Sequence, residues 1–265
     1  MFEHRFPYLE PVTPDGLETI ERGWMRIVSE LGIRFDHPEA LRVLAEHGQR
    51  IEGDIAFLDP AWVLEMVGRA PAQFTFHARN PERSVEIGGP NSVFLPVQGA
   101  PFVRRGDERR DAELRDVEDI LRLVQAHDEY DIGGMWPCEP NDLPLDSRHL
   151  DVLRAHAVLT DKPFGTHAIS VDSAQDGLAV ARILFGDRLE REVVTYTNIN
   201  ANSPLVFDAR MLDALLVYAK ARQPVLVVPF LLMGAMAPAS TVAARNRANP
   251  CNNGPIEGSL ASASN

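Results

Sequence analysis

A repeat of short apolar runs, separated by stretches of helical length, most constrains the fold of this chain. Successive runs begin roughly 29–39 residues apart, which is the size of one βα unit. A closed parallel barrel needs eight such units. The pattern stops after the fifth run, so we expect an α/β fold that contains about half of a (β/α)8 barrel. The predicted strands are Ser92–Val97, Asp131–Met135, Pro163–His167, Glu192–Thr197 and Pro224–Phe230.

Four amphipathic helices are predicted between and after these strands. In the first of them, Leu114, Val117 and Leu121 fall on one face, while Asp116 and Glu118 fall on another. One-sided helices around continuously apolar strands are typical of a parallel sheet that helices cover. The predicted helices are Leu114–Ala126, Leu145–Leu159, Ala174–Phe185 and Asp208–Ala221.

The first ninety residues follow a different pattern, which predicts an N-terminal α+β segment. Helical periodicity begins at Pro14, at Pro38 and at Pro60, and proline favours the first turn of a helix. Period-two alternation predicts two short antiparallel hairpins, one over Ile51–Leu58 and one over Phe74–Ile87.

The last part of the chain has neither helical nor strand periodicity. It is rich in Ala, Ser, Asn and Pro, a composition typical of loops or disorder. We therefore divide the chain into an N-terminal segment over residues 1–90, half a barrel over 91–238 and an irregular tail over 239–265. An open half barrel leaves unpaired edges and apolar surface, which favour aggregation or pairing with a second half.

Composition argues against several classes of function. The net charge of −12 disfavours nucleic acid as a partner, because phosphate binding needs an excess of Lys and Arg. No apolar run approaches the roughly 20 residues of a membrane span, and the first residues lack the apolar block of a signal peptide, so we expect a cytoplasmic protein. Cys138 and Cys251 lack metal-ligand spacing, so neither a metal site nor a structural disulfide is expected.

Polar and aromatic residues follow the predicted strands, where the sites of parallel α/β folds lie. The asparagines of Asn198–Ser203 either orient a substrate carboxylate or carbonyl, or cap the loop and the next helix. His167 is either a general acid or base or a structural histidine. Trp136 and Glu139 either hold an ammonium group, or are a packed ring and a solvated carboxylate. The candidate substrate-binding residues are Gln98, Trp136, Glu139, His167, Asn198, Asn200 and Asn202, and no catalytic residue is assigned.

Six sequence blocks occur in series over roughly residues 17–238. They are Leu31–Ala40, Phe76–Pro81, Arg148–Asp151, Thr160–Pro163, Asn200–Leu205 and Pro229–Pro238. In this order they resemble the trimethylamine methyltransferase family, the corrinoid-dependent group that also includes glycine betaine methyltransferases. The resemblance stops just after Pro238, close to the point where the strand–helix pattern also stops.

The resemblance implies a TIM barrel about twice this length, so we expect a C-terminally truncated member. Members of this family transfer a methyl group from a tertiary or quaternary amine, such as trimethylamine or glycine betaine, to the Co(I) centre of a separate corrinoid protein. The resemblance therefore implies a corrinoid protein as partner, with no cofactor bound directly, and a homo-oligomer is possible. Two alternatives stay open, namely an inactive pseudoenzyme fragment and a different TIM-barrel enzyme that acts on a small polar substrate.

Overall fold

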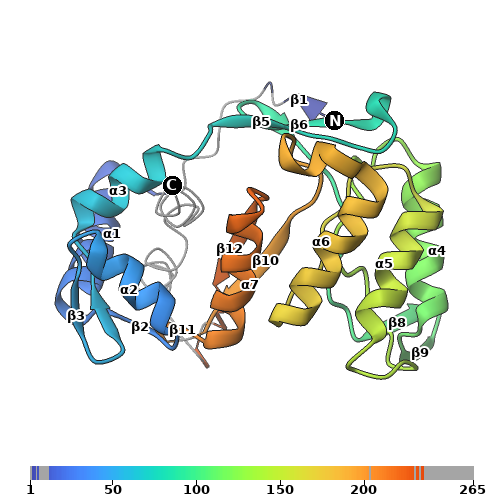
Figure 1. Cartoon of the computed structure of the whole chain (residues 1–265). Coiled ribbons are helices and arrows are strands. Elements are labelled where there is room, and N and C mark those ends of the chain that lie inside the picture. Colours follow the sequence, from blue (N-terminus) through green and yellow to red (C-terminus); the bar gives the residue numbers. More distant parts are fainter. Residues whose placement is uncertain are drawn as a thin grey trace. The chain divides into compact units, whose positions relative to one another are not determined.

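The structure is a computed structural model that describes residues 2, 3, 5, 12–202, 204–229, 231, 232, 234 and 235. The chain divides into two compact units and passes between them several times, once within strand β10 (Thr197–Ala201) (Figure 1). The fold is mixed α/β with seven described α-helices, and the described residues form no closed barrel. The predicted division at residues 90 and 238 stays a prediction. The first unit holds Met1–Arg5, Ala72–Thr197 and Ala221–Pro224, and the second holds Phe6–Pro71, Asn198–Lys220 and Val225–Asn265.

The helices predicted near the N-terminus are confirmed in the second unit, and each begins with a proline. A side chain caps the first turn of each helix by accepting a backbone N–H, as helix N-termini require. The helices are α1 (Pro14–Arg26), which continues into the π-helical turn η1 (Ile27–Leu31), α2 (Pro38–Glu46) and α3 (Pro60–Gly68), and their caps are Thr13, His37 and Asp59.

Four short strands of the second unit form one sheet in the order β11-β2-β4-β3. The predicted hairpin over Ile51–Leu58 is confirmed as the β3–β4 pair. The parallel pairing of β11 with β2 was not predicted, because it joins two very short segments that are far apart in the sequence. Helix α7 (Ala209–Lys220) follows β11. The strands are β2 (Ile33–Phe35), β3 (Arg50–Glu52), β4 (Ile55–Phe57) and β11 (Val206–Phe207).

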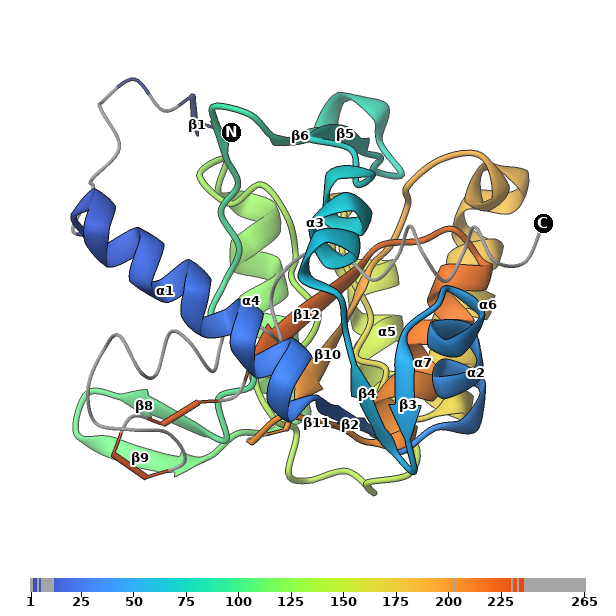
Figure 2. The same ribbon diagram turned by 90° about the vertical axis from the view of Figure 1, so that its left-hand side faces the viewer.

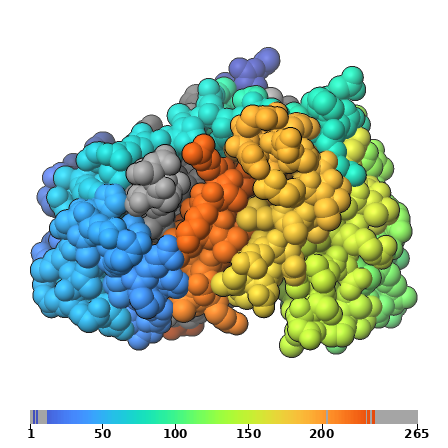
Figure 3. Space-filling view, viewed as in Figure 1, coloured from blue at the N-terminus to red at the C-terminus, as the bar shows by residue number. Residues whose placement is uncertain are grey.

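Three helices of the first unit pack in sequence order, α4 against α5 and α5 against α6 (Figure 1). They are α4 (Leu114–Ala126), α5 (Arg148–Leu159) and α6 (Val171–Phe185), and α6 continues into the 3₁₀ turn η3 (Gly186–Glu190). The outer face of α6 is at the surface, gold in Figure 3. The predicted helices are therefore confirmed, although α5 begins later and α6 earlier than the periodicity predicts.

The described residues of the same unit form three antiparallel strand pairs. The predicted hairpin over Phe74–Ile87 is confirmed as β5–β6, with the 3₁₀ turn η2 between its strands. The β8–β9 hairpin was not predicted, because its exposed charged residues hide the alternation. The pairs are β1 (Phe2–Glu3) with β7 (Asn91–Ser92), β5 (Gln73–Phe76) with β6 (Val85–Gly88), and β8 (Phe102–Arg105) with β9 (Glu108–Asp111), and η2 covers Pro81–Arg83.

The segments predicted as barrel strands are hydrogen-bonded to one another in sequence order, but few form regular strands. Of the described parts of these segments, only β10 and β12 (Val225–Pro229) make a regular ladder of any length, side by side in Figure 2. Among the described residues, hydrogen bonds join Asp131 N–H to the Phe94 carbonyl (2.9 Å), Gly133 N–H to Pro163 (2.8 Å), Thr166 N–H to Tyr196 (2.7 Å) and Thr197 N–H to Pro224 (3.1 Å).

Proline and glycine explain why the predicted strands over Asp131–Met135 and Pro163–His167 are extended but irregular. Pro163 has no N–H to donate to a ladder, and Gly134 has a φ of +74°, outside the β region. The predicted strand over Ser92–Val97 likewise keeps only Ser92, in β7. Phe230 and the predicted tail over 239–265 lie outside the described residues. No helix within the described part of the chain is long and apolar enough to cross a membrane.

Candidate functional site

Three candidate residues of the first unit meet a fourth residue, Arg148, which begins one of the six sequence blocks but was not among the candidate site residues. The rings of Trp136 and His167 lie 4.8 Å apart at an angle of 31°. The guanidinium carbon of Arg148 lies 5.6 Å from the centre of the Trp136 ring. Arg148 Nη2 also lies 2.9 Å from Glu139 Oε2. We refer to Trp136, Glu139, Arg148 and His167 as the Trp136 cluster.

Each member of the Trp136 cluster follows from its place in the chain. Trp136 and Glu139 come directly after the extended segment over 131–135, and His167 ends the segment over 163–167. Arg148 is the first residue of α5. The four side chains therefore meet where two consecutive parallel segments end and a connecting helix begins. That they line a substrate pocket stays a prediction.

The cluster is largely shielded from water and carries no net charge. Trp136 is 4% exposed, and its Nε1 has no hydrogen-bond partner among the described residues. The side chains of Arg148 and Glu139 are 18% and 24% exposed, so their ion pair is screened less than one on the surface. Burial lowers the pKa of His167, with Arg148 lowering it further and Glu139 opposing the shift. The imidazole is therefore neutral at neutral pH.

A second pair of titratable side chains lies next to Arg148 in the sequence. His149 Nε2 is 2.8 Å from a carboxylate oxygen of Asp176, which joins α5 to α6. This contact gives His149 a packing role between the two helices. It supports the end of α5 from which Arg148 extends.

Gln98 uses its amide on the surrounding backbone. Its Oε1 accepts the N–H groups of Met135 (2.8 Å) and Trp136 (2.7 Å). Its Nε2 donates to the carbonyls of Pro96 (2.8 Å) and Val97 (3.1 Å). This side chain thus fixes the loop from which Trp136 extends, and its predicted role in lining the substrate pocket stays a prediction.

We expect the substitution Gln98→Leu to lower the free energy of unfolding by about 2 kcal/mol, because two backbone N–H groups lose their acceptor. Gln98→Glu keeps an acceptor oxygen and should cost less. Urea unfolding of both variants at the same pH measures the difference. Equal stability of Gln98→Leu and the unchanged chain would contradict this role for the amide.

The three candidate asparagines lie in the second unit. Asn198 and Asn200 alternate with buried residues along β10, and Asn198 Oδ1 is buried without a hydrogen-bond partner among the described residues. Asn202 Nδ2 donates to Asp208 Oδ2 at 2.7 Å, while Asp208 Oδ1 accepts the N–H of Met211 at the start of α7. Asn202 therefore contributes to the cap of α7, which is one of the two roles predicted for these asparagines. The side-chain carbonyl oxygen of Asn198 has no partner among the described residues, so the other predicted role, binding a ligand, stays a prediction for Asn198.

The described residues contain no group of three His, Cys, Asp or Glu side chains that could hold a metal ion. Cys138 is a buried free thiol, and burial raises its pKa to about 12. Cys251 lies outside the described residues. The thiol of Cys138 is therefore a packed group rather than a nucleophile.

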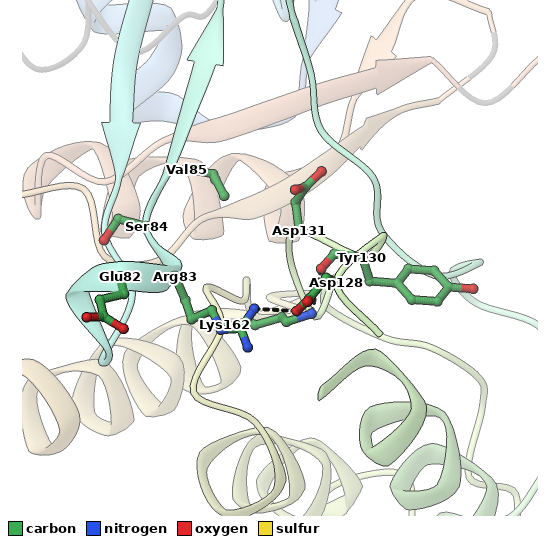
Figure 4. Close-up of a pocket in the computed structure, with 8 residues that line it drawn as sticks. All are labelled: Glu82, Arg83, Ser84, Val85, Asp128, Tyr130, Asp131 and Lys162. Atoms are coloured by element: carbon green, nitrogen blue, oxygen red, sulfur yellow. Dashed lines mark hydrogen bonds and ion pairs between the residues drawn. The ribbon is translucent and has the colours of Figure 1, made fainter. Parts of the chain in front are cut away.

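A pocket of about 210 Å³ lies elsewhere in the first unit, close to the start of the segments over 131–135 and 163–167 (Figure 4). Arg83 Nη1 is paired with Asp128 at 2.6 Å. The ammonium of Lys162 donates to three backbone carbonyls. Because both cations are already paired and this end of a parallel fold serves stability, we do not assign the substrate to this pocket. It is lined by Glu82, Arg83, Ser84, Val85, Asp128, Tyr130, Asp131 and Lys162.

Comparison with known proteins identifies the family. The family model described as trimethylamine methyltransferase (MTTB) matches residues 1–249. The chain belongs to the trimethylamine methyltransferase family. The resemblance of the six sequence blocks is confirmed, and the match to the trimethylamine methyltransferase family extends beyond Pro238, where those blocks stop.

Several curated relatives within the family are similar over most of this chain. The glycine betaine methyltransferase of Desulfitobacterium hafniense (strain Y51) is 38% identical over 237 residues, which cover 88% of this chain and 50% of that protein. The proline betaine:corrinoid methyltransferase of Eubacterium limosum is 27% identical, over 91% of this chain and 51% of that protein. The trimethylamine methyltransferase MttB of Desulfitobacterium hafniense (strain DSM 10664 / DCB-2) is 24% identical, over 83% and 45%. The chain thus spans about half the length of the curated relatives it matches.

Proposed function

We propose that this chain is a methyltransferase that takes a methyl group from a quaternary or tertiary amine, such as glycine betaine or trimethylamine, and passes it to a corrinoid protein. The observation that carries the proposal is the Trp136 cluster, an aromatic face and a carboxylate at the carboxyl ends of parallel segments. The names of two relatives, proline betaine:corrinoid methyltransferase and L-carnitine:corrinoid methyltransferase, support the proposal, because each name pairs a methylated amine with a corrinoid. We further propose that the protein is cytoplasmic.

We also propose that the chain forms part of a TIM barrel. The hydrogen bonds that join the extended segments in sequence order support this, because consecutive βα units place their strands side by side. Apolar side chains left exposed within each unit also support it. In the first unit, Phe94 and Val97 are 49% and 69% exposed, and in the second, Leu226 and Val228 of β12 are 52% and 41% exposed.

The cluster suits a methylated ammonium group for chemical reasons. A quaternary nitrogen has no N–H to donate, so it is held by ring faces and negative charge. Trp136 supplies the ring, Glu139 the charge, and neutral His167 adds no repulsion. A corrinoid partner would supply the reduced cobalt that accepts the methyl group, and the amine would keep the electron pair of the broken carbon–nitrogen bond. The residues of this chain then hold the methyl group in line for the displacement.

The experiment is methyl transfer from methyl-labelled glycine betaine to free cob(I)alamin, catalysed by the 265-residue chain. We expect Trp136→Leu to lower kcat/KM by roughly 5- to 30-fold, which corresponds to one cation–π contact of about 1–2 kcal/mol. Trp62→Leu, a substitution in the second unit, is the matched control and should keep activity. Absence of transfer by the unchanged chain would overturn the proposed function.

One observation favours a second candidate, an inactive half of a methyltransferase. The chain covers only 50% of the glycine betaine methyltransferase. If this is correct, the chain alone transfers no methyl group, and activity appears only when a chain that carries the remaining half is added. Activity on an unrelated small polar substrate, without methyl transfer, would instead favour the other alternative, a different TIM-barrel enzyme.

A further inference from the structure

One face of the β8–β9 hairpin carries two arginines that lie directly opposite each other. Arg104 pairs with Arg109 across the ladder, and Phe102 lies on the same face, so the three side chains are neighbours. All three are exposed, Phe102 at 44% and the Arg104 side chain at 69%. We refer to these three residues, together with Asp111 opposite Phe102, as the outer face of the hairpin.

The other face of the hairpin holds it to the protein. Val103 packs against the hydrophobic core of the first unit. Arg110 is paired with Asp116 at 2.7 Å and Arg105 with Asp119 at 2.9 Å. Both carboxylates belong to α4, which lies beside the hairpin in Figure 1. The outer face is therefore turned away from α4 and into solvent.

The two guanidinium groups of the outer face lack a carboxylate that balances them. Arg109 lies over the Phe102 ring at 3.7 Å and makes no ion pair with any residue that the structure describes. Arg104 reaches only Asp107, at 3.6 Å, and that carboxylate is fully exposed. Asp111 lies opposite Phe102, so neither arginine faces a carboxylate across the ladder. Like charges opposite each other destabilise a strand pair, and a partner's carboxylate placed between them would remove that cost.

The hairpin begins and ends beside the loop of the Trp136 cluster. At its start, the Pro101 carbonyl accepts an Nδ2–H of Asn141 at 3.1 Å. At its end, the Ala112 carbonyl accepts the backbone N–H of Asn141 at 2.9 Å. Because the loop over 136–141 follows the extended segment over 131–135, the hairpin stands at the carboxyl ends of the parallel segments, where the sites of such folds lie.

We propose that the outer face of the β8–β9 hairpin docks a carboxylate-bearing surface of the corrinoid protein. This docking role rests on the proposed function and names the surface that receives its partner. A methyl acceptor has to reach the end of the fold where the substrate lies, and the hairpin stands at that end. Planar guanidinium groups match carboxylates in a bidentate way, and arginine and aromatic side chains are enriched at protein interfaces. Nucleic acid fits this face less well, because the chain carries a net charge of −12.

Biolayer interferometry on the immobilised 265-residue chain tests the proposal. The probes are the corrinoid protein of the organism that makes this chain, loaded with cobalamin, and free cobalamin alone. We expect the protein probe to bind. Arg104→Gln and Arg109→Gln together should raise its Kd roughly 10- to 100-fold, the range of one or two arginine anchors in an interface. Because salt screens surface charges, the Kd of the unchanged chain should rise with ionic strength, and that of the double variant much less.

Arg105→Gln is the matched control, since Arg105 lies on the same hairpin, is 70% exposed and uses its charge on Asp119. Its Kd should stay within about twofold of that of the unchanged chain. The double variant should unfold at the same urea concentration as the unchanged chain or at a higher one, because it removes the opposed charges. Urea unfolding thus separates weaker docking from a damaged fold.

No binding of the corrinoid protein by the unchanged chain, or an unaltered Kd in the double variant, overturns the proposal. An equal loss of affinity in Arg105→Gln also overturns it, since net charge rather than the outer face would then decide. So does self-association of the unchanged chain that the double variant loses, because the face would then dock a second copy. Methyl transfer to free cob(I)alamin without binding of the corrinoid protein would overturn the docking role alone, and binding without transfer would overturn the proposed function alone.

Discussion

Replacing Lys162 by methionine is expected to lower the free energy of unfolding by about 3 kcal/mol. The ammonium of Lys162 donates to the carbonyls of Val124 (2.7 Å), His127 (2.7 Å) and Tyr130 (2.6 Å), and the residue is 2% exposed. These carbonyls belong to the end of α4 and the turn after it, where a helix leaves acceptors unpaired. Methionine fills the space of the stem but donates nothing, so the three acceptors lose their partner.

The figure of about 3 kcal/mol counts roughly 1 kcal/mol for each hydrogen bond, below the value for fully charge-assisted bonds. Burial lowers the pKa of Lys162, which shows that desolvation of the ammonium offsets part of the gain. Urea unfolding followed by tryptophan fluorescence measures the loss, and Trp136 reports on this unit. Lys220→Met is the control, since Lys220 is 59% exposed and should change stability by less than about 0.5 kcal/mol. If Lys162→Met also changes the free energy of unfolding by less than about 0.5 kcal/mol, the three carbonyls do not depend on the ammonium for stability.

Acid is expected to destabilise the first unit through His156. Its side chain is fully buried and stacks on Phe164 at 4.8 Å, and its Nε2–H donates to the Met135 carbonyl at 3.3 Å. Burial lowers its pKa from 6.5 to about 4. Between these values the unfolded chain binds a proton that the folded chain does not. The stabilisation is therefore complete above about pH 6.5 and is lost as the pH falls to about 4, by about 3 kcal/mol.

The variant His156→Gln isolates this contribution, because glutamine can still donate to Met135 but does not titrate. Between pH 7 and pH 4, the free energy of unfolding of this variant should fall by about 3 kcal/mol less than that of the unchanged chain. His127→Gln is the control, since His127 is 57% exposed and belongs to the same unit. The same pH dependence in His156→Gln and the unchanged chain would exclude His156 as the source.

Helices were predictable here because their information is local. The bounds of α4 match the predicted Leu114–Ala126, since its apolar stripe lies within the segment and its capping box, formed by Glu113 and Asp116, marks its start. The start of α5 was predicted too early, at Leu145, because turns after Pro144 precede Arg148. The barrel strands were harder to predict, because a run of apolar residues does not show where a residue such as Pro163 or Gly134 interrupts the hydrogen-bonded ladder.

The site was predictable only to the level of strand ends. The sequence pointed to Trp136, Glu139 and His167 separately, and the structure brings them together. Arg148 begins the sequence block Arg148–Asp151 but was not a candidate site residue, because a basic residue at the start of a helix is ordinary unless its partners are known. Nor did the sequence show that Gln98 holds the loop of Trp136, since that role depends on contacts with backbone groups far along the chain.

The buried thiol of Cys138 can report how often the first unit opens. The residue is 1% exposed, and only the thiolate reacts with alkylating reagents, so a pKa of about 12 leaves it almost inert while the unit stays closed. Each opening event exposes it to reagent at the reactivity of an ordinary cysteine. The rate at which an alkyl group accumulates on Cys138 therefore counts openings of the core around Trp136, without any label or substitution in the protein.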